Sequence, residues 1–205
     1  MSEPLGPELV KLLGQAACLR IAGLLLEEPG PAWAEELEAL RGEVPYGPLC
    51  TAAQRALREA SSELYFSVAA PAGPLSFREA TYRDSITLGN LLSELRGLYE
   101  AFGYKPVCAE PPDHAAVQLG FASFLRLKEV FLYHTGEKER AQRLGRFTVG
   151  FVCDHPAKVL KGVREAGGAQ ADNYLGCAVS AACSYLEKEF PGLGGEADLQ
   201  GGGSE

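Results

Sequence analysis

Residues 112–136 read PDHAAVQLGFASFLRLKEVFLYHTG and carry the clearest helical pattern of the chain. Their apolar side chains recur mostly at steps of three and four residues, which is the spacing of one face of an α-helix. Pro112 suits the first turn of a helix, where its missing N–H costs nothing, and Gly136 is a typical helix-ending residue. The stretch therefore predicts one long helix between these two residues, with apolar positions at Val117, Phe121, Phe124, Leu125, Phe131 and Leu132.

The same spacing continues on both sides of this helix, and runs of β-branched residues are almost absent, so the sequence predicts an all-α fold. Prolines and glycines divide the remaining helices. We expect Asp84 or Ser85 to cap one helix and Gly103 to close it in a left-handed conformation. The other predicted helices cover 7–24, 33–40, 48–66, 137–152, 154–166 and 169–189, with proline-bearing loops at 69–75 and 104–111.

The length of 205 residues and a hydrophobic content of 46% predict one folded domain, which we place at residues 1–190. Residues 191–205 are Gly-rich and acidic, and we expect a disordered tail. The net charge is −8 and the pI is about 5.0, which argues against nucleic-acid binding because phosphate backbones need clustered Lys and Arg. The same charge would attract a basic partner.

The six cysteines form no C-x-x-C pair, and we interpret them as reduced, mostly buried thiols of a cytoplasmic protein. The first residues show no basic segment followed by an apolar run, and no Arg-Arg pair occurs, so no export signal is predicted. The longest strongly apolar stretch, 173–186, has 14 residues. A membrane helix needs roughly 20, so we expect no stable insertion into a membrane.

Two Asp-His pairs are the most distinctive polar feature. Asp113-His114 lies at the start of the best helix, and Asp154-His155 lies near another predicted helix start. In the simplest interpretation, the helix dipole favours Asp113 by roughly 0.3–1 kcal/mol and His114 is a surface or partly packed ring. Alternatively, the first pair binds a ligand or peptide, with His114 neutral because positive charge is disfavoured at a helix N-terminus.

A metal-dependent hydrolase is the alternative enzymatic hypothesis, with Asp113, His114, Asp154 and His155 as the ligands. It requires both helix starts to converge in space. HD-type phosphohydrolases use the order His-Asp together with upstream histidines, whereas His134 is the only other histidine here. The sequence also lacks a phosphate-binding loop, a G-x-S-x-G elbow and a zinc-ligand spacing, so no catalytic or metal-binding residue is predicted from motifs.

The motif Glu110-Pro111-Pro112-Asp113-His114 resembles the E-P-x-D-H signature of the TorD/DmsD/NarJ-like redox enzyme maturation chaperones. LYEAFG at 98–103 is similar to the segment that precedes this signature in the family, and AVQLGF at 116–121 is similar to the helix that follows it. FVCDH at 151–155 resembles the family's later F-L-x-D-H. Gln118 and Gly120 depart from the family pattern, which often has acidic residues there.

The resemblance implies a single-domain helical bundle of the TorD-like type that acts as a cytoplasmic chaperone without catalysis or a cofactor. Such a chaperone binds the signal peptide, often twin-arginine, and the apo form of the catalytic subunit of a molybdenum-cofactor oxidoreductase. It assists maturation of this molybdoenzyme before export or assembly. Members exist as monomers and as swapped homodimers, and both states stay open here. Guanine-nucleotide binding is also associated with the family, but the chain has no phosphate loop to support it.

The resemblance and the residue types together predict a peptide-binding site around the signature. Its polar part would be Glu110, Asp113 and His114. Aromatic contacts and flanking residues would come from Tyr99, Phe102, Glu79 and Tyr82.

Overall fold

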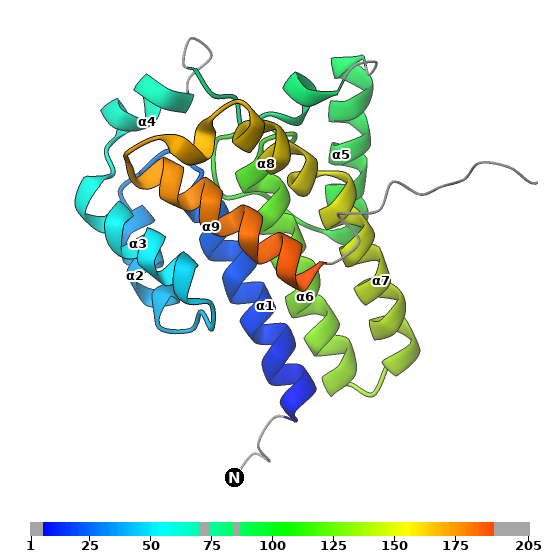
Figure 1. Cartoon of the computed structure of the whole chain (residues 1–205). Helices are drawn as coiled ribbons and strands as arrows, with labels where there is room; N and C mark the ends of the chain where they lie inside the picture. Colours follow the sequence, from blue (N-terminus) through cyan, green and yellow to red (C-terminus); the bar gives the residue numbers. More distant parts are fainter. Residues whose placement is uncertain (1–5, 70–73, 84–86, 191–205) are drawn as a thin grey trace, which may run out of the picture.

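The computed structural model of the chain describes residues 6–69, 74–83 and 87–190 (Figure 1). Within these ranges every regular element is an α-helix or a short 3₁₀ helix, and the only β-type pairing is an isolated bridge between Arg78 and His114. The prediction of an all-α, single-domain helical bundle is confirmed.

The helices follow one another with short connections. They are α1 Pro7–Leu24, α2 Trp33–Arg41, α3 Gly47–Glu59, α4 Ser62–Ala69, α5 Leu88–Phe102, α6 Ala115–His134, α7 Lys138–Asp154, α8 Pro156–Glu165 and α9 Tyr174–Glu189, with 3₁₀ turns η1 at Glu79–Tyr82 and η2 at Gly168–Gln170.

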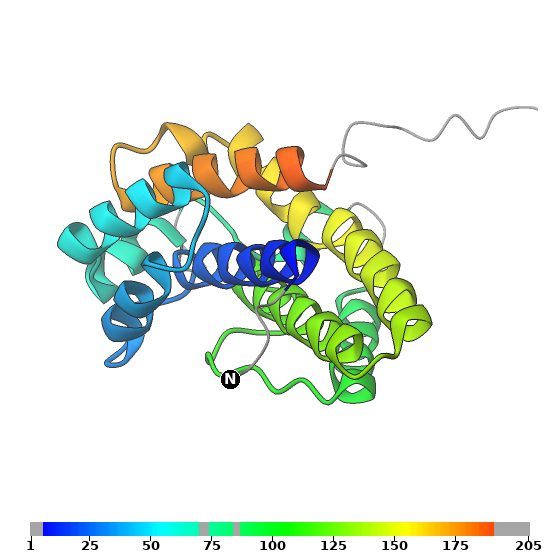
Figure 2. The same ribbon diagram turned by 90° about the horizontal axis from the view of Figure 1, so that it is seen from below.

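Helices α1 and α6 form the centre of the bundle and run antiparallel to each other (Figures 1 and 2). Gly23 of α1 lies against the first turns of α6, where a Cβ atom would be only 3.0 Å from the carbonyl oxygen of Ala116. Further along, the hydroxyl of Ser123 donates to the carbonyl oxygen of Ala16 at 2.8 Å. Small residues thus let the two helices approach closely, while α7 packs on α6 and α9 packs on α3 and α8.

The helix predicted over 48–66 is wrong, because two helices occupy this stretch. The backbone of Ala60 is extended, with ψ at 134°. Ser61 then accepts a hydrogen bond from the N–H of Leu64 at 3.1 Å and so starts α4. The hydroxyl of Ser61 therefore caps the start of a new helix, and α3 does not continue through this residue.

The start of α6 also differs from the prediction. His114, and not Pro112, precedes the first helical residue, and its Nδ1 accepts from the N–H of Ala116 at 3.2 Å. Asp113 therefore lies outside the helix and does not sit in its first turn. Helix α9 similarly begins at Tyr174 and not at 169, since Asn173 caps it through Gly176.

The end of α5 agrees with the sequence, since Gly103 has the expected left-handed conformation with φ at 73°. Its predicted caps Asp84 and Ser85 lie outside the described residues, as do residues 70–73 of the predicted loop and the predicted tail 191–205.

All six cysteines are free, but the expectation that most are buried is wrong: only Cys18 and Cys183 are buried, and the other four are partly exposed. Across the part of the chain that the structure describes, no helix is long and apolar enough to cross a membrane.

Candidate functional site

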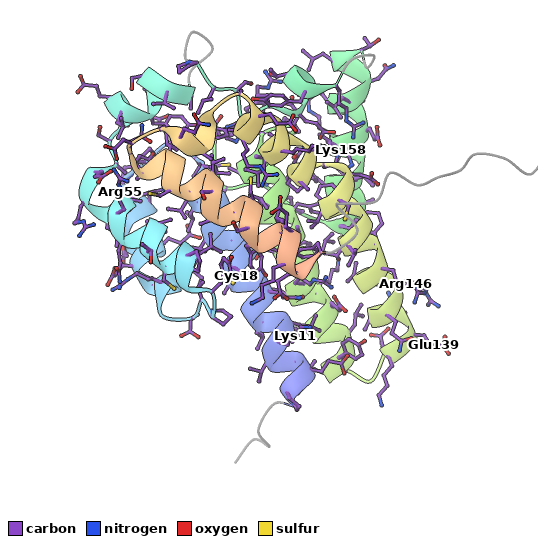
Figure 3. All side chains as sticks on the ribbon, in the orientation of Figure 1. Lys11, Cys18, Arg55, Glu139, Arg146 and Lys158 are labelled. Carbon is purple, nitrogen blue, oxygen red and sulfur yellow. The ribbon has the colours of Figure 1, made fainter. Side chains whose placement is uncertain are left out.

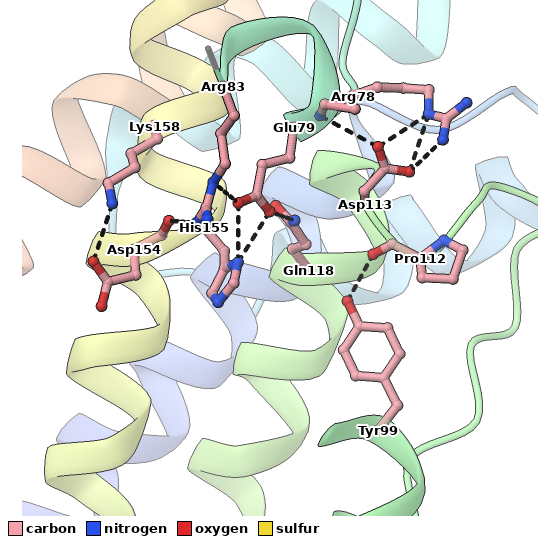
Figure 4. A network of polar contacts seen from close by, with 11 residues as sticks. Arg78, Glu79, Arg83, Tyr99, Pro112, Asp113, Gln118, Asp154, His155 and Lys158 are labelled. Carbon is pink, nitrogen blue, oxygen red and sulfur yellow. Dashed lines mark hydrogen bonds and ion pairs between the residues drawn. The ribbon is translucent and has the colours of Figure 1, made fainter. Parts of the chain in front are cut away.

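Asp113 is completely buried and forms a two-pronged ion pair with Arg78 (Figure 4). The Nη2 and Nε atoms of Arg78 lie 2.7 and 3.0 Å from Oδ1 of Asp113, and Nε is also 3.2 Å from Oδ2. Backbone hydrogen bonds reinforce this contact, with the N–H of Glu79 donating to the carbonyl oxygen of Asp113 at 2.8 Å and the N–H of Ala115 donating to that of Phe77. Asp113 thus fastens the segment 76–83 to the start of α6.

Glu79, the next residue on this segment, is the hub of a second buried contact (Figure 4). Its carboxylate accepts from the amide of Gln118 on α6 and pairs with Arg83 on its own segment. Its Oε2 lies 2.9 Å from Nδ1 of His155, at the junction of α7 and α8. Arg83 also donates to the backbone carbonyl of Asp154 at 2.9 Å. One carboxylate therefore links three separate parts of the chain.

These contacts join one residue of each Asp-His pair, Asp113 and His155, to the segment 76–83 in an arrangement that we call the buried network. It consists of Arg78, Glu79, Arg83, Asp113, Gln118 and His155. The segment 76–83 is the common partner of both pairs, with Arg78 contacting the first pair and Glu79 contacting the second.

His114 starts a separate chain of hydrogen bonds. Its Nδ1 accepts from a backbone N–H, so in the neutral ring the proton is on Nε2, which lies 3.4 Å from the hydroxyl of Tyr65. Tyr65 in turn donates to Oε1 of Glu110 at 2.8 Å. Burial, with a smaller effect of Arg78, lowers the pKa of His114 to about 3. The expectation of a neutral His114 agrees with this, although burial is the main cause.

Four of the seven predicted peptide-contacting side chains are buried: Glu79, Tyr99, Asp113 and His114. The hydroxyl of Tyr99 donates to the carbonyl oxygen of Pro112 at 2.8 Å (Figure 4). In this conformation these groups bond to other parts of the chain and present no surface to a peptide.

The remaining three, Tyr82, Phe102 and Glu110, are partly exposed. The ring of Tyr82 packs on Gly162, where a Cβ atom would lie 2.3 Å from the ring, so only glycine fits there. Phe102 stacks on Phe147 with ring centroids 5.0 Å apart. The structure thus brings the predicted residues into one region but divides them between the buried network and its edges.

The ligand set of the metal-hydrolase hypothesis is not assembled. Asp113 is bound to Arg78, His114 faces Tyr65, and His155 is bound to Glu79. The fourth residue, Asp154, is 66% exposed at its side chain and pairs with Lys158 of the next helical turn. Among the residues that the structure describes, no group of three or more His, Cys, Asp or Glu side chains is placed to hold a metal ion.

No family model, curated protein or solved structure matches the chain. The comparisons therefore neither support nor contradict the resemblance of its motifs.

The most important residues that the sequence analysis missed are Arg78, Arg83 and Tyr65, which hold the predicted acids and histidine. Along the sequence, Arg78 is 35 residues from its partner Asp113, and Tyr65 is 45 and 49 residues from its partners Glu110 and His114. Helical periodicity carries no information about such distant pairs. The only local signal was the spacing of Glu79 and Arg83, which are four residues apart.

An open groove lies on another side of α6, bordered by α1, α2 and the connection that follows α5. Its volume is about 390 Å³. Leu40 of α2, Val107 and Cys108 of the connection and Phe124 and Leu127 of α6 provide a mainly apolar lining. We call this feature the groove.

Gly120 lines the groove and lies against Tyr104. A Cβ atom at this position would lie 2.6 Å from the Tyr104 hydroxyl. Any larger side chain would displace the tyrosine that forms part of the wall. The absence of an acidic residue here is therefore a packing requirement of this chain.

Proposed function

We propose that this protein is a maturation chaperone of the TorD-like type, which binds the signal peptide and apo form of a molybdoenzyme catalytic subunit in the cytoplasm. The resemblance of several ordered motifs to that family provides the hypothesis. The protein would act by binding and release, with no chemical step of its own.

The observation that best supports the proposal is the convergence of these motifs. The segments 110–114 and 151–155 are about forty residues apart, and both resemble family motifs. Glu79 and Arg78, on a segment that follows the family pattern only loosely, join them through buried hydrogen bonds. The two motif segments thus contact the same segment of the folded chain, as expected if they belong to one functional unit.

Charge gives weaker support, because a chain with a net charge of −8 attracts a basic peptide. Part of this charge, from Glu196, Asp198 and Glu205, lies outside the described residues. The remaining excess still favours a partner with arginines near an apolar stretch.

The proposal is tested by calorimetry of the full chain with a synthetic peptide that has two adjacent arginines followed by an apolar run. We expect saturable binding, with a Kd in the micromolar range or below, that weakens as salt is added. One control peptide has both arginines replaced by glutamine, and a second has the apolar run replaced by serines. Equal binding of all three peptides, or no binding of any, would contradict the proposed function.

A further inference from the structure

Large apolar side chains continue along α6 beyond the groove. Phe124, Leu127 and Phe131 are spaced by three and four residues and so lie on one face of the helix. Leu127 is 49% exposed and Phe131 is 62% exposed. Together with Val107, which is 92% exposed at the groove edge, they form an apolar surface that this chain does not cover within its described part.

The other end of the groove has two carboxylates around one guanidinium. Arg20 and Glu36 both line it, and Arg20 pairs with Glu36 at 2.7 Å and with the buried Glu27 at 3.2 Å. Burial raises the pKa of the Glu27 carboxyl. The charge of Arg20 partly opposes this rise, and the charge of Glu36 adds to it.

Two further carboxylates lie next to these residues along the chain. Glu28 follows Glu27 and is exposed, and Glu110 lies two residues after Cys108, which lines the groove. Glu110 is partly exposed, and its carboxylate accepts from the hydroxyl of Tyr65 at 2.8 Å. Burial raises the pKa of Glu110, and the charge of Glu28 adds to this rise. A cationic group beside these carboxylates would reduce the repulsion between them.

We propose that the apolar segment of the signal peptide lies along α6 in the groove, with its preceding basic residues at the acidic end near Glu28, Glu36 and Glu110. This inference rests on the proposed function and adds the binding surface and the direction of the peptide. The surface from Gly120 to Phe131 covers twelve residues of α6, and the helical rise between the first and the last is about 16 Å. A peptide helix of about three turns matches it, and such a helix satisfies its own backbone hydrogen bonds against an apolar wall.

The apolar half of the surface is tested with Phe131→Ser in the full chain, titrated with the two-arginine peptide described above. Since burying a phenylalanine contributes about 1.5–3 kcal/mol, we expect affinity to fall by about tenfold or more. The matched control is Phe66→Ser, which replaces another exposed phenylalanine, on α4, and should leave the affinity within about twofold.

The acidic half is tested with Glu28→Lys, which changes an exposed side chain next to Glu110. We expect binding to weaken by about fivefold at low salt, and the difference from the unmodified chain to disappear at high salt. The control is Glu139→Lys at the start of α7, on a distant part of the surface (Figure 3), whose side chain is 89% exposed. Equal effects of the two substitutions would show only a general charge effect and would overturn the acidic end as the binding position.

The direction is tested by NMR with a nitroxide on the peptide. A label beside the arginines should broaden the amide signals of Glu28 and Val107, and a label at the far end should broaden those of Phe131 and His134. The opposite pattern would overturn the direction. Unchanged affinity in Phe131→Ser would overturn the placement of the apolar segment along α6 but leave the proposed function intact, whereas a peptide that binds no form of the protein would contradict both.

Discussion

The residues at the start of α6 and those in its second half differ in burial and in the partners of their side chains. At its start, Asp113, His114 and Gln118 are buried and bonded to distant parts of the chain. In its second half, Leu127 and Phe131 are exposed and apolar. The difference indicates that the residues most recognisable in the sequence hold the fold together, while the surface available to a partner is made of ordinary apolar residues.

The largest loss of stability should come from Glu79→Ala, which removes the central carboxylate of the buried network. It leaves His155 and Gln118 buried without their partner, so we expect the free energy of unfolding to fall by about 3–5 kcal/mol, measured by urea denaturation. Asp154→Ala is the control, because its exposed side chain pairs with Lys158 and the substitution keeps the backbone carbonyl that Arg83 contacts, so the loss should be less than about 1 kcal/mol. Similar losses for both would mean that the network is not what stabilises this end of α6.

A smaller loss of stability is expected when the pH is lowered. The pKa of His114 is about 3 in the folded chain and near 6.5 in the unfolded chain. Between these two values the unfolded chain binds a proton at this residue and the folded chain does not. Stability from this residue is therefore present above about pH 6.5 and is lost as the pH falls towards 3. Between pH 7.5 and 5.0 we expect a loss of about 2 kcal/mol.

The pH effect is measured as the difference between the unmodified chain and His114→Gln in urea denaturation at both pH values, because all other titrating groups are common to both proteins. His134→Gln, at the end of α6, should keep the full pH dependence. If His114→Gln keeps it as well, the ring of His114 is not held neutral in the folded state.

The smallest effect on stability should come from the open half of α6. Phe131→Ser removes a side chain that is 62% exposed, so we expect the free energy of unfolding to change by less than about 0.5 kcal/mol. Urea denaturation of this variant beside Phe66→Ser provides the measurement. A loss above about 2 kcal/mol would mean that Phe131 belongs to the core and that the two halves of α6 are alike.

The sequence predicts the fold better than it predicts the site. Local chemistry determines the helix that begins at Pro7 and the left-handed Gly103, and both are confirmed. The break before α4 is harder to predict, because Ala60 is a good helix former and the hydroxyl of Ser61 decides the outcome. A single serine inside an apolar pattern gives little warning of such a break.

At the site, the motif residues were found from sequence, but their roles depend on contacts between distant segments. The bond of Arg78 to Asp113 and that of Glu79 to His155 exist only after α6, α7 and α8 have packed. One signal for the groove was present in the sequence: the apolar residues of 115–134 cover more than one face of the helix. A helix with apolar residues on this many sides needs partners on each of them.

The central claim is that a peptide binds the open groove while the buried network stays closed. Methyl NMR of the full chain, titrated with the two-arginine peptide, tests it most directly. We predict saturable shifts for the methyl groups of Leu40, Val107 and Leu127, and none for Leu75 and Val159, which are buried beside the segment 76–83 and in α8. Shifts confined to Leu75 and Val159 would contradict the account, because they would show that the network itself opens to receive the peptide.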